Sequence, residues 1–348
     1  MLRAKSGAGC AACEVFIRQR GSERYYRKVL PFIAWLVLFS LTPFLLGQDK
    51  KEKSKQPDTT VVGEARLWRD PGNISARDVF WGSGGEAEKP DTSKVTFVKE
   101  HPGGYSVKYE VRDGRDRKWV VKLGNEARPE TTANRLLWAV GYVTELNYLV
   151  PCVHIKDAPK PRKDVKRCEG DGFADARFEA RGEGVKRGEN WAWKSNPFVG
   201  KRELHGLVVL MALLNNWDLK DENNVILQVT NADGSVERRY VISDLGATFG
   251  KTGGAMSHSR NEPEKYVKTK FVEGAKGDRV RFAFSGKQGE LMDQVTVSDA
   301  KWIGGLLAQL SDQQLKDAFR AANFQPGEMQ MLVAAVKDRI NQLVSLPG

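Results

Sequence analysis

The chain has 348 residues, of which 41% are hydrophobic and 28% charged, and its net charge at pH 7 is +11. This length and apolar content allow a substantial core in one large or two modest lobes, which excludes a wholly disordered chain. Residues 1–60 hold 11 Lys and Arg against 5 Asp and Glu, and the rest holds 44 against 39. The rest is therefore only mildly basic, and nucleic acid is not the expected partner.

Residues 29–47 carry no charged side chain and have basic residues on both sides. Such a stretch predicts insertion in a membrane, between a basic leader at residues 1–28 and a Lys-rich linker at residues 48–60. Its length favours a transmembrane anchor, whereas Pro43 and Gly47 favour a signal segment cleaved near Gln48. Basic residues are balanced across the segment, so the topology stays undecided. We expect a membrane-anchored or exported protein.

A small β-rich lobe is predicted for residues 61–200. Apolar residues alternate at residues 95–98, 105–111 and 119–123, which is typical of strands, and a helix begins at Pro129. Residues 147–150 and 176–180 supply further strands on either side of a basic insert at residues 157–172. The basic side chains of this insert are predicted to form a solvated surface that faces an acidic substrate; they are Lys160, Arg162, Lys163, Lys166 and Arg167.

Two cysteines, Cys152 and Cys168, flank most of this insert. In an exported protein they would form a disulfide that closes the insert. With His154 nearby a metal site is the alternative, but it lacks a fourth ligand.

A second, mainly helical lobe is predicted for residues 201–348. Apolar residues nearly encircle a helix at residues 202–215, which implies burial on most sides. A hairpin follows at residues 225–243 with its turn at residues 231–234. Residues 247–264 are rich in Gly, Ser, Thr and Lys, as in a mobile loop, and helices are expected at residues 302–310, 313–323 and 328–343, with Ser311 and Pro326 at helix starts.

Polar residues that could take part in catalysis lie just before and just after this hairpin. Asp218 and Asn223 are five residues apart, a step that lets a carboxylate face an attacking hydroxyl while an amide oxygen reaches a metal ion. Asp244 follows the second strand, and Gly246 allows a sharp turn past it. Phosphoryl transfer needs such groups, because catalysis consists mainly of positioning the nucleophile and neutralising phosphate charge through magnesium.

These motifs resemble those of protein kinases. Residues 218–223, Asp-Leu-Lys-Asp-Glu-Asn, resemble the catalytic loop D-L-K-x-x-N, and Asp244-Leu-Gly246 resembles D-F-G. Residues 119–122 resemble the strand V-A-I-K, and the helix after Pro129 is similar to its counterpart in HipA-type serine kinases. No G-x-G-x-x-G precedes the strand. Residues 102–108 look instead like the short phosphate loop of HipA-type or phosphoinositide kinases, and Asn216 replaces the usual histidine, which indicates an atypical branch.

The resemblance implies an α+β, bilobal kinase-like fold that moves the γ-phosphate of ATP to a hydroxyl of an unknown acceptor. In this reading Asp218 orients or deprotonates the acceptor, Asn223 and Asp244 hold Mg²⁺, and Lys122 holds the phosphates. Glu130 is the implied ion-pair partner of Lys122, and the implied nucleotide-binding loop contributes Gly103, Gly104 and Lys108. The alternatives are a catalytically inactive binding module in the cell envelope and a domain that binds acidic polymer through its basic insert. The oligomeric state is not predicted.

Overall fold

The computed structural model describes residues 63–182, 184–254 and 257–347. The predicted leader, membrane segment and linker, residues 1–28, 29–47 and 48–60, lie outside the described residues. Among the helices that are described, none has both the length and the apolar character needed to cross a membrane.

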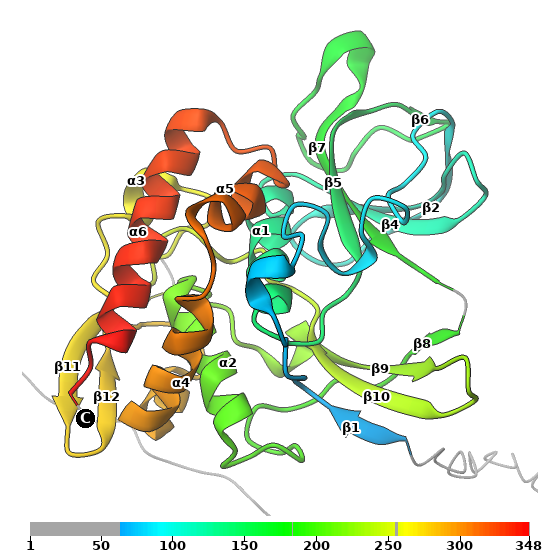
Figure 1. Cartoon of the computed structure of the whole chain (residues 1–348). Helices are drawn as coiled ribbons and strands as arrows, with labels where there is room; N and C mark the ends of the chain where they lie inside the picture. Colours follow the sequence, from blue (N-terminus) through cyan, green and yellow to red (C-terminus); the bar gives the residue numbers. More distant parts are fainter. Residues whose placement is uncertain (1–62, 183, 255–256, 348) are drawn as a thin grey trace, which may run out of the picture. The chain divides into compact units, whose positions relative to one another are not determined.

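A six-stranded sheet forms the first half of the described chain (Figure 1). Its β4 strand shows why the chain folds this way: Trp119, Val121 and Leu123 enter an apolar core on one face, and the intervening Val120 and Lys122 lie on the other. The strands in spatial order are β5 (Asn147–Val153), β7 (Phe173–Ala180), β4 (Lys118–Leu123), β3 (Val107–Arg112), β2 (Val95–His101) and β6 (Ile155–Lys156).

Helix α1 (Ala127–Ala139) lies beside this sheet and also contacts the C-terminal helices. Ala133, Leu136 and Leu137 on α1 belong to the main core of the described chain. The Thr132 hydroxyl donates to the carbonyl of Ala318, 3.2 Å away in another helix. α1 therefore joins the sheet to the helical half.

A second sheet contains the predicted hairpin. Strands β9 (Asn224–Thr230) and β10 (Val236–Ile242) pair antiparallel across the turn expected from the sequence. Two short strands that the sequence did not reveal extend this sheet at its edges, in the order β1 (Glu64–Arg66), β10, β9 and β8 (Val185–Arg187).

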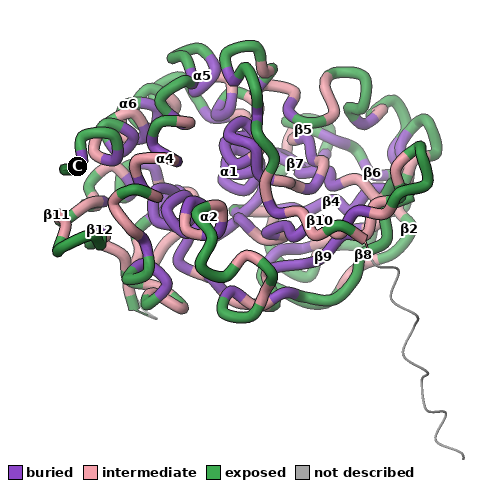
Figure 2. The backbone as a smooth tube through the Cα atoms, turned by 60° about the horizontal axis from the view of Figure 1, so that its bottom comes forward, coloured by how far each residue is buried: buried purple, intermediate pink, exposed green. Residues whose placement is uncertain are grey.

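The second half is mainly helical, and its core is continuous with α1 (Figure 2). Helix α2 (Arg202–Leu213) is buried on most sides, as predicted. Ser311 begins its helix through a capping box with Gln314, and Pro326 is the first residue of the last helix, also as predicted. The other elements are α3 (Pro263–Tyr266), α4 (Val297–Leu307), α5 (Asp312–Arg320) and α6 (Pro326–Val344), with a small hairpin of β11 (Val272–Lys276) and β12 (Arg279–Phe282).

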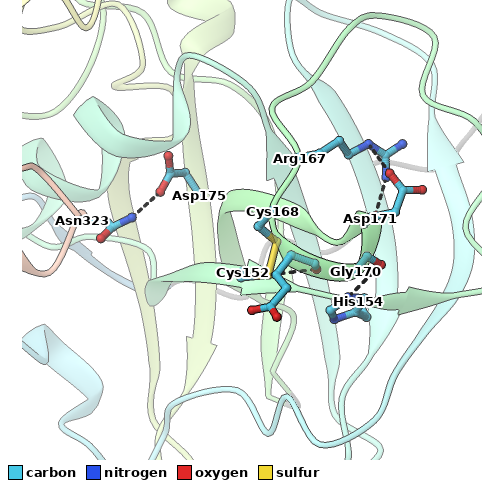
Figure 3. Close-up of a disulfide and its surroundings, with 9 residues drawn as sticks. Cys152, His154, Arg167, Cys168, Gly170, Asp171, Asp175 and Asn323 are labelled. Carbon is cyan, nitrogen blue, oxygen red and sulfur yellow. Dashed lines mark hydrogen bonds and ion pairs between the residues drawn. A yellow bond between two sulfur atoms is a disulfide. The ribbon is translucent and has the colours of Figure 1, made fainter.

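Cys152 and Cys168 form a disulfide with their Cα atoms 5.8 Å apart (Figure 3). Next to it, His154 Nε2 lies 3.1 Å from the carbonyl of Gly170, and Arg167 donates to the carbonyl of Asp171. No group of three or more His, Cys, Asp or Glu arranged to hold a metal ion occurs in the described part of the chain. The structure thus contains the disulfide alternative and not the metal site.

Several element boundaries differ from the sequence prediction, and the starts of β3 and α1 are two of them. Strand β3 begins at Val107 instead of residue 105, because Arg162 and Lys163 of the basic insert bind backbone carbonyls of the preceding turn. Part of the insert is thus packed against the sheet and is not wholly solvated. Helix α1 begins at Ala127, two residues before Pro129. The proline is tolerated within the first helical turn, because the N–H that it lacks would have no partner in the helix.

Candidate active site

The predicted pair of Lys122 and Glu130 is present. Lys122 Nζ donates to Glu130 Oε2 at 2.6 Å and lies 3.2 Å from Asp244 Oδ1, with the lysine fully buried. Burial would lower the pKa of Lys122, but the carboxylates of Asp244 and Glu130 outweigh it and raise this pKa above its ordinary value. The side chain is therefore a permanent buried cation between strand β4, helix α1 and the end of β10.

Further buried charges extend from this pair. Arg177 on β7, the register partner of Lys122, lies 3.3 Å from Glu130 Oε1 and donates to Glu179 at 2.8 Å. Glu179 also binds Arg181, and Arg187 binds Glu145. The motifs did not reveal this network, because its members lie on strands and connections with no recognisable spacing.

The end of helix α2 sets the position of the loop at residues 216–223. Asn215 adopts the left-handed conformation, with φ of 54°, that commonly ends a helix, and its side chain donates to the carbonyl of Gly250 at 2.8 Å. The chain then turns into Trp217 and Asp218. The Asn223 side chain donates to the Asp218 carbonyl at 2.7 Å and lies 3.3 Å from Asp218 Oδ2. The two predicted loop residues are thus adjacent and held in place.

Asp244 is brought beside this loop by backbone contacts. The N–H groups of Ser243 and Asp244 both donate to the carbonyl of Asn223, at 2.8 and 3.2 Å. Burial would raise the pKa of Asp244, but Lys122 and Lys108 bring it down to about 2. Gly246 is required here, because a Cβ atom at this position would lie 2.5 Å from the Cβ of Glu126. Asp244 is therefore an ionised carboxylate next to Asn223.

The predicted phosphate loop lies at the turn between β2 and β3. Gly103 and Gly104 are exposed, and Arg162 donates to the carbonyls of both. Lys108 is the register neighbour of Lys122 on β3, and burial together with the charge of Lys122 lowers its pKa. Lys108 thus lies beside the Lys122 and Asp244 pair, and the two glycines lie in an exposed turn.

A cavity of about 600 Å³ lies beside Asp244 and the loop at residues 216–223. Asp218, Asn223 and Asp244 line it together with residues that the sequence prediction missed. Glu126, just before α1, accepts from Ser106 Oγ at 2.6 Å and pairs with Arg260. The charged and imidazole side chains that the prediction missed come from the loop before α3 and the segment after β12, which carry no motif; they are His258, Arg260 and Lys287. Lys220 of the catalytic-loop motif lies beside them.

The loop at residues 247–254 and 257–264 is held by specific contacts. Phe249 is fully buried, His258 stacks on Trp217 with ring centroids 3.6 Å apart, and Arg260 lies over the rings of Tyr105 and Trp217. The expected mobile loop is therefore, in its described part, a wall of the cavity.

Among solved structures, this chain is similar to several kinases. CtkA, a proinflammatory kinase of Helicobacter pylori, aligns with 73% of this chain and 96% of its own at 10% identity, with a TM-score of 0.44. A Golgi casein kinase with Mn and ADP bound aligns with 74% of this chain and 72% of its own at 11% identity, with a TM-score of 0.38. The Rio2 kinase of Chaetomium thermophilum, in an ADP, Mg²⁺ and phosphoaspartate complex, aligns with 74% of each chain at 14% identity, with a TM-score of 0.32. No family model matches the sequence, and no curated protein matches it.

The described chain combines a six-stranded sheet and helix α1 with a mainly helical half. The catalytic-loop residues Asp218 and Asn223 line one cavity together with Asp244. The strand lysine Lys122 and the helix glutamate Glu130 are buried next to Asp244 and do not line this cavity. The α+β class expected from the sequence is confirmed in the coarser form of a mixed α and β structure.

Proposed function

We propose that the protein is an ATP-dependent kinase that transfers the γ-phosphate to a hydroxyl group. The observation that carries this proposal is the convergence of Asp218, Asn223 and Asp244 at one cavity, with the buried Lys122 Nζ 3.2 Å from Asp244 Oδ1. Lys122 is fixed by its ion pairs with Glu130 and Asp244. We propose that it supplies the fixed cation that nucleotide phosphates need.

Asp218 is the group that we expect to orient the acceptor. Its Oδ1 atom is buried and accepts no hydrogen bond from the described residues, although Lys287 Nζ lies 3.2 Å away outside hydrogen-bond geometry. An acceptor hydroxyl would satisfy this atom by donating its proton to it. The Asp218 Oδ2 atom is already engaged by Lys220 and Asn223. Orientation of the hydroxyl at Oδ1 is the catalytic contribution we assign to this residue.

The residues at the hairpin ends fit a magnesium ion. Among the described residues, no hydrogen bond reaches the side-chain oxygen of Asn223 or Asp244 Oδ2. Mg²⁺ is commonly held by one or two carboxylates together with substrate phosphates, so this small set is sufficient. We therefore propose that Asn223 and Asp244 hold Mg²⁺ with ATP, where the ion would neutralise phosphate charge. Lys108, Gly103 and Gly104 would complete the phosphate side of the cavity.

The test uses the purified full-length chain. We expect Mg²⁺ and ATP together to raise the melting temperature and to support γ-phosphate transfer to a mixture of hydroxyl acceptors. Asp244→Asn should abolish the magnesium-dependent thermal shift. Asp218→Asn should retain the shift but lower the transfer rate about 10²-fold or more, because it removes the acceptor-orienting carboxylate.

The matched control is Asp278→Asn, a change of the same type at an exposed position far from the cavity lining. It should leave both the thermal shift and the transfer rate unchanged. A nucleotide-dependent shift without transfer to any acceptor would reject the kinase and favour a nucleotide-binding module. A folded wild-type chain with no shift would reject nucleotide binding altogether.

We also propose that the domain is exported or membrane-anchored in an oxidising compartment. The disulfide between Cys152 and Cys168 supports this, because disulfides persist mainly outside the reducing cytosol. Residues 29–47 would supply the membrane segment. Alkylation of the chain in intact cells, followed by mass spectrometry, should find both cysteines protected. Complete labelling of both as free thiols would contradict the proposal.

A further inference from the structure

We propose that the acceptor carries a carboxylate or phosphate next to its reacting hydroxyl, and that Lys287 binds this anionic group. The inference rests on the proposed kinase function and names the chemical class of its acceptor. It depends on the position of Lys287, on the balance of charge around Asp218, and on the sides from which the groups approach this carboxylate.

The backbone that carries Lys287 is hydrogen-bonded to the catalytic loop. Its N–H donates to the carbonyl of Trp217 at 2.9 Å. The side chain of the next residue, Gln288, donates to the carbonyl of Leu219 at 2.8 Å and to Asp221 at 3.0 Å. Gly286 permits this close approach, because a Cβ atom there would lie 2.8 Å from the Trp217 carbonyl oxygen. Lys287 therefore extends into the cavity lining from a backbone segment that is fixed to the catalytic loop.

The two oxygens of Asp218 face different groups. The side chains of Lys220 and Asn223 both donate hydrogen bonds to Asp218 Oδ2, at 3.0 and 3.3 Å. Among the described residues, Lys287 is the one that forms an ion pair at Oδ1, the atom left without a hydrogen-bond donor. Because Asn223 belongs to the proposed metal side, Lys287 stands on the opposite side, beside the place of the acceptor hydroxyl.

Two lysine ammonium groups share the single negative charge of Asp218. Glu126 is paired with Arg260 and lies 3.7 Å from Lys122, which also pairs with Asp244. Asp218 has two ammonium partners, Lys220 and Lys287. The Lys287 side chain is also 51% exposed, so it can meet an incoming group. An anion on the acceptor would take up the surplus positive charge, whereas a cation there would be repelled.

The experiment measures kcat and KM of the full-length chain on three seryl peptides that differ only in the residues flanking serine, which are Glu, Gln or Lys. We expect KM for the Glu peptide to be about tenfold lower than for the Gln peptide, as a charge-assisted contact would give. The Lys peptide should be the poorest acceptor. Glycerol 3-phosphate compared with glycerol distinguishes a small phosphorylated acceptor from an acidic peptide.

Two variants separate recognition from a merely structural role. Lys287→Gln should raise KM for the Glu peptide about tenfold with little change on the Gln peptide, and Lys287→Glu should reverse the ranking of the Glu and Lys peptides. Lys268→Gln, a neutralisation at an exposed lysine outside the cavity lining, is the control and should leave the ranking intact.

Three results would overturn the inference. They are equal KM values for all wild-type acceptors, a ranking unchanged in Lys287→Glu, and an equal loss of kcat on every peptide in Lys287→Gln, which would make Lys287 a positioning residue for Asp218 only. Failure of the kinase proposal itself is distinguished by the thermal shift with Mg²⁺ and ATP, which does not involve an acceptor.

Discussion

Arg177 is the residue on which the buried charges around Lys122 depend most. It is almost completely buried and lies between the carboxylates of Glu130 and Glu179. Removing one partner from a buried ionic network leaves an uncompensated charge and costs about 3–5 kcal/mol. We therefore expect Arg177→Met to lower the free energy of unfolding by this amount in urea denaturation. Arg112→Met removes an exposed ion pair and should cost less than about 1 kcal/mol. Equal effects of the two changes would contradict the importance of the network.

Glu145 should give the protein an unusual pH dependence. Burial and the neighbouring Glu179 carboxylate raise the pKa of Glu145 to about 7, against the attraction of Arg187, Arg181 and Arg177. In the folded chain this group therefore keeps its proton at a pH where the unfolded chain has lost it, so its contribution to stability is lost as pH rises from about 4.5 to about 7.

Glu145→Gln cannot titrate, so its free energy of unfolding relative to wild type should rise as pH increases from 5 to 8. The measurement is urea denaturation of both proteins at several pH values, since groups common to both cancel in the difference. A difference that stays flat across this range would show that Glu145 ionises equally in both states.

At the scale of elements, the disulfide ties the edge strand β5 of the six-stranded sheet to the basic insert. The bridge joins residues 16 apart, and closing a loop of about 15 residues is worth about 3 kcal/mol. The double variant Cys152→Ala with Cys168→Ala should lose about this much in the free energy of unfolding. Because the bridge lies outside the cavity lining, nucleotide affinity should change little. A loss of nucleotide binding larger than the loss of stability would contradict this separation.

The sequence predicted the elements whose patterns are local. The alternation in β4, the apolar surround of α2, the turn between β9 and β10 and the cap at Ser311 all depend on residues close in the chain, and the structure contains each of them. Edge strands β1 and β8 were missed, because three-residue strands are too short to show a period.

The candidate site likewise contains residues that local motifs predicted and residues that they did not. Lys122, Glu130, Asp218, Asn223 and Asp244 belong to motifs with fixed spacing, and the structure brings them together. The pairing of Arg260 with Glu126 joins residues more than 130 positions apart, and the contact of Lys287 with Asp218 comes from a segment without any motif. Such contacts arise from tertiary packing, which no local pattern encodes.

For the whole described chain, the position of α1 determines how nucleotide would act. Although α1 lies between strands in sequence, its Arg128 pairs with Glu328 at the start of α6, and Thr132 binds the carbonyl of Ala318 in α5. The helix is therefore fixed to the C-terminal helices before any ligand binds. By contrast, the turn at residues 102–105 is exposed and meets the cavity wall through the contact of Tyr105 with Arg260.

We therefore expect amide hydrogen exchange in α1 to follow that of α2 and α5, and to change little when Mg²⁺ and ATP are added. Protection gained with nucleotide should concentrate in residues 102–106 and in the loop before α3, because these segments border the cavity without belonging to the core. Arg128→Gln tests the cause, since loss of its pair with Glu328 should speed exchange in the first turn of α1 while the strands stay unchanged. If nucleotide instead slowed exchange throughout α1 in the wild-type chain, the helix would be a mobile element that ligand binding orders, and Glu130 would reach Lys122 only in the bound state.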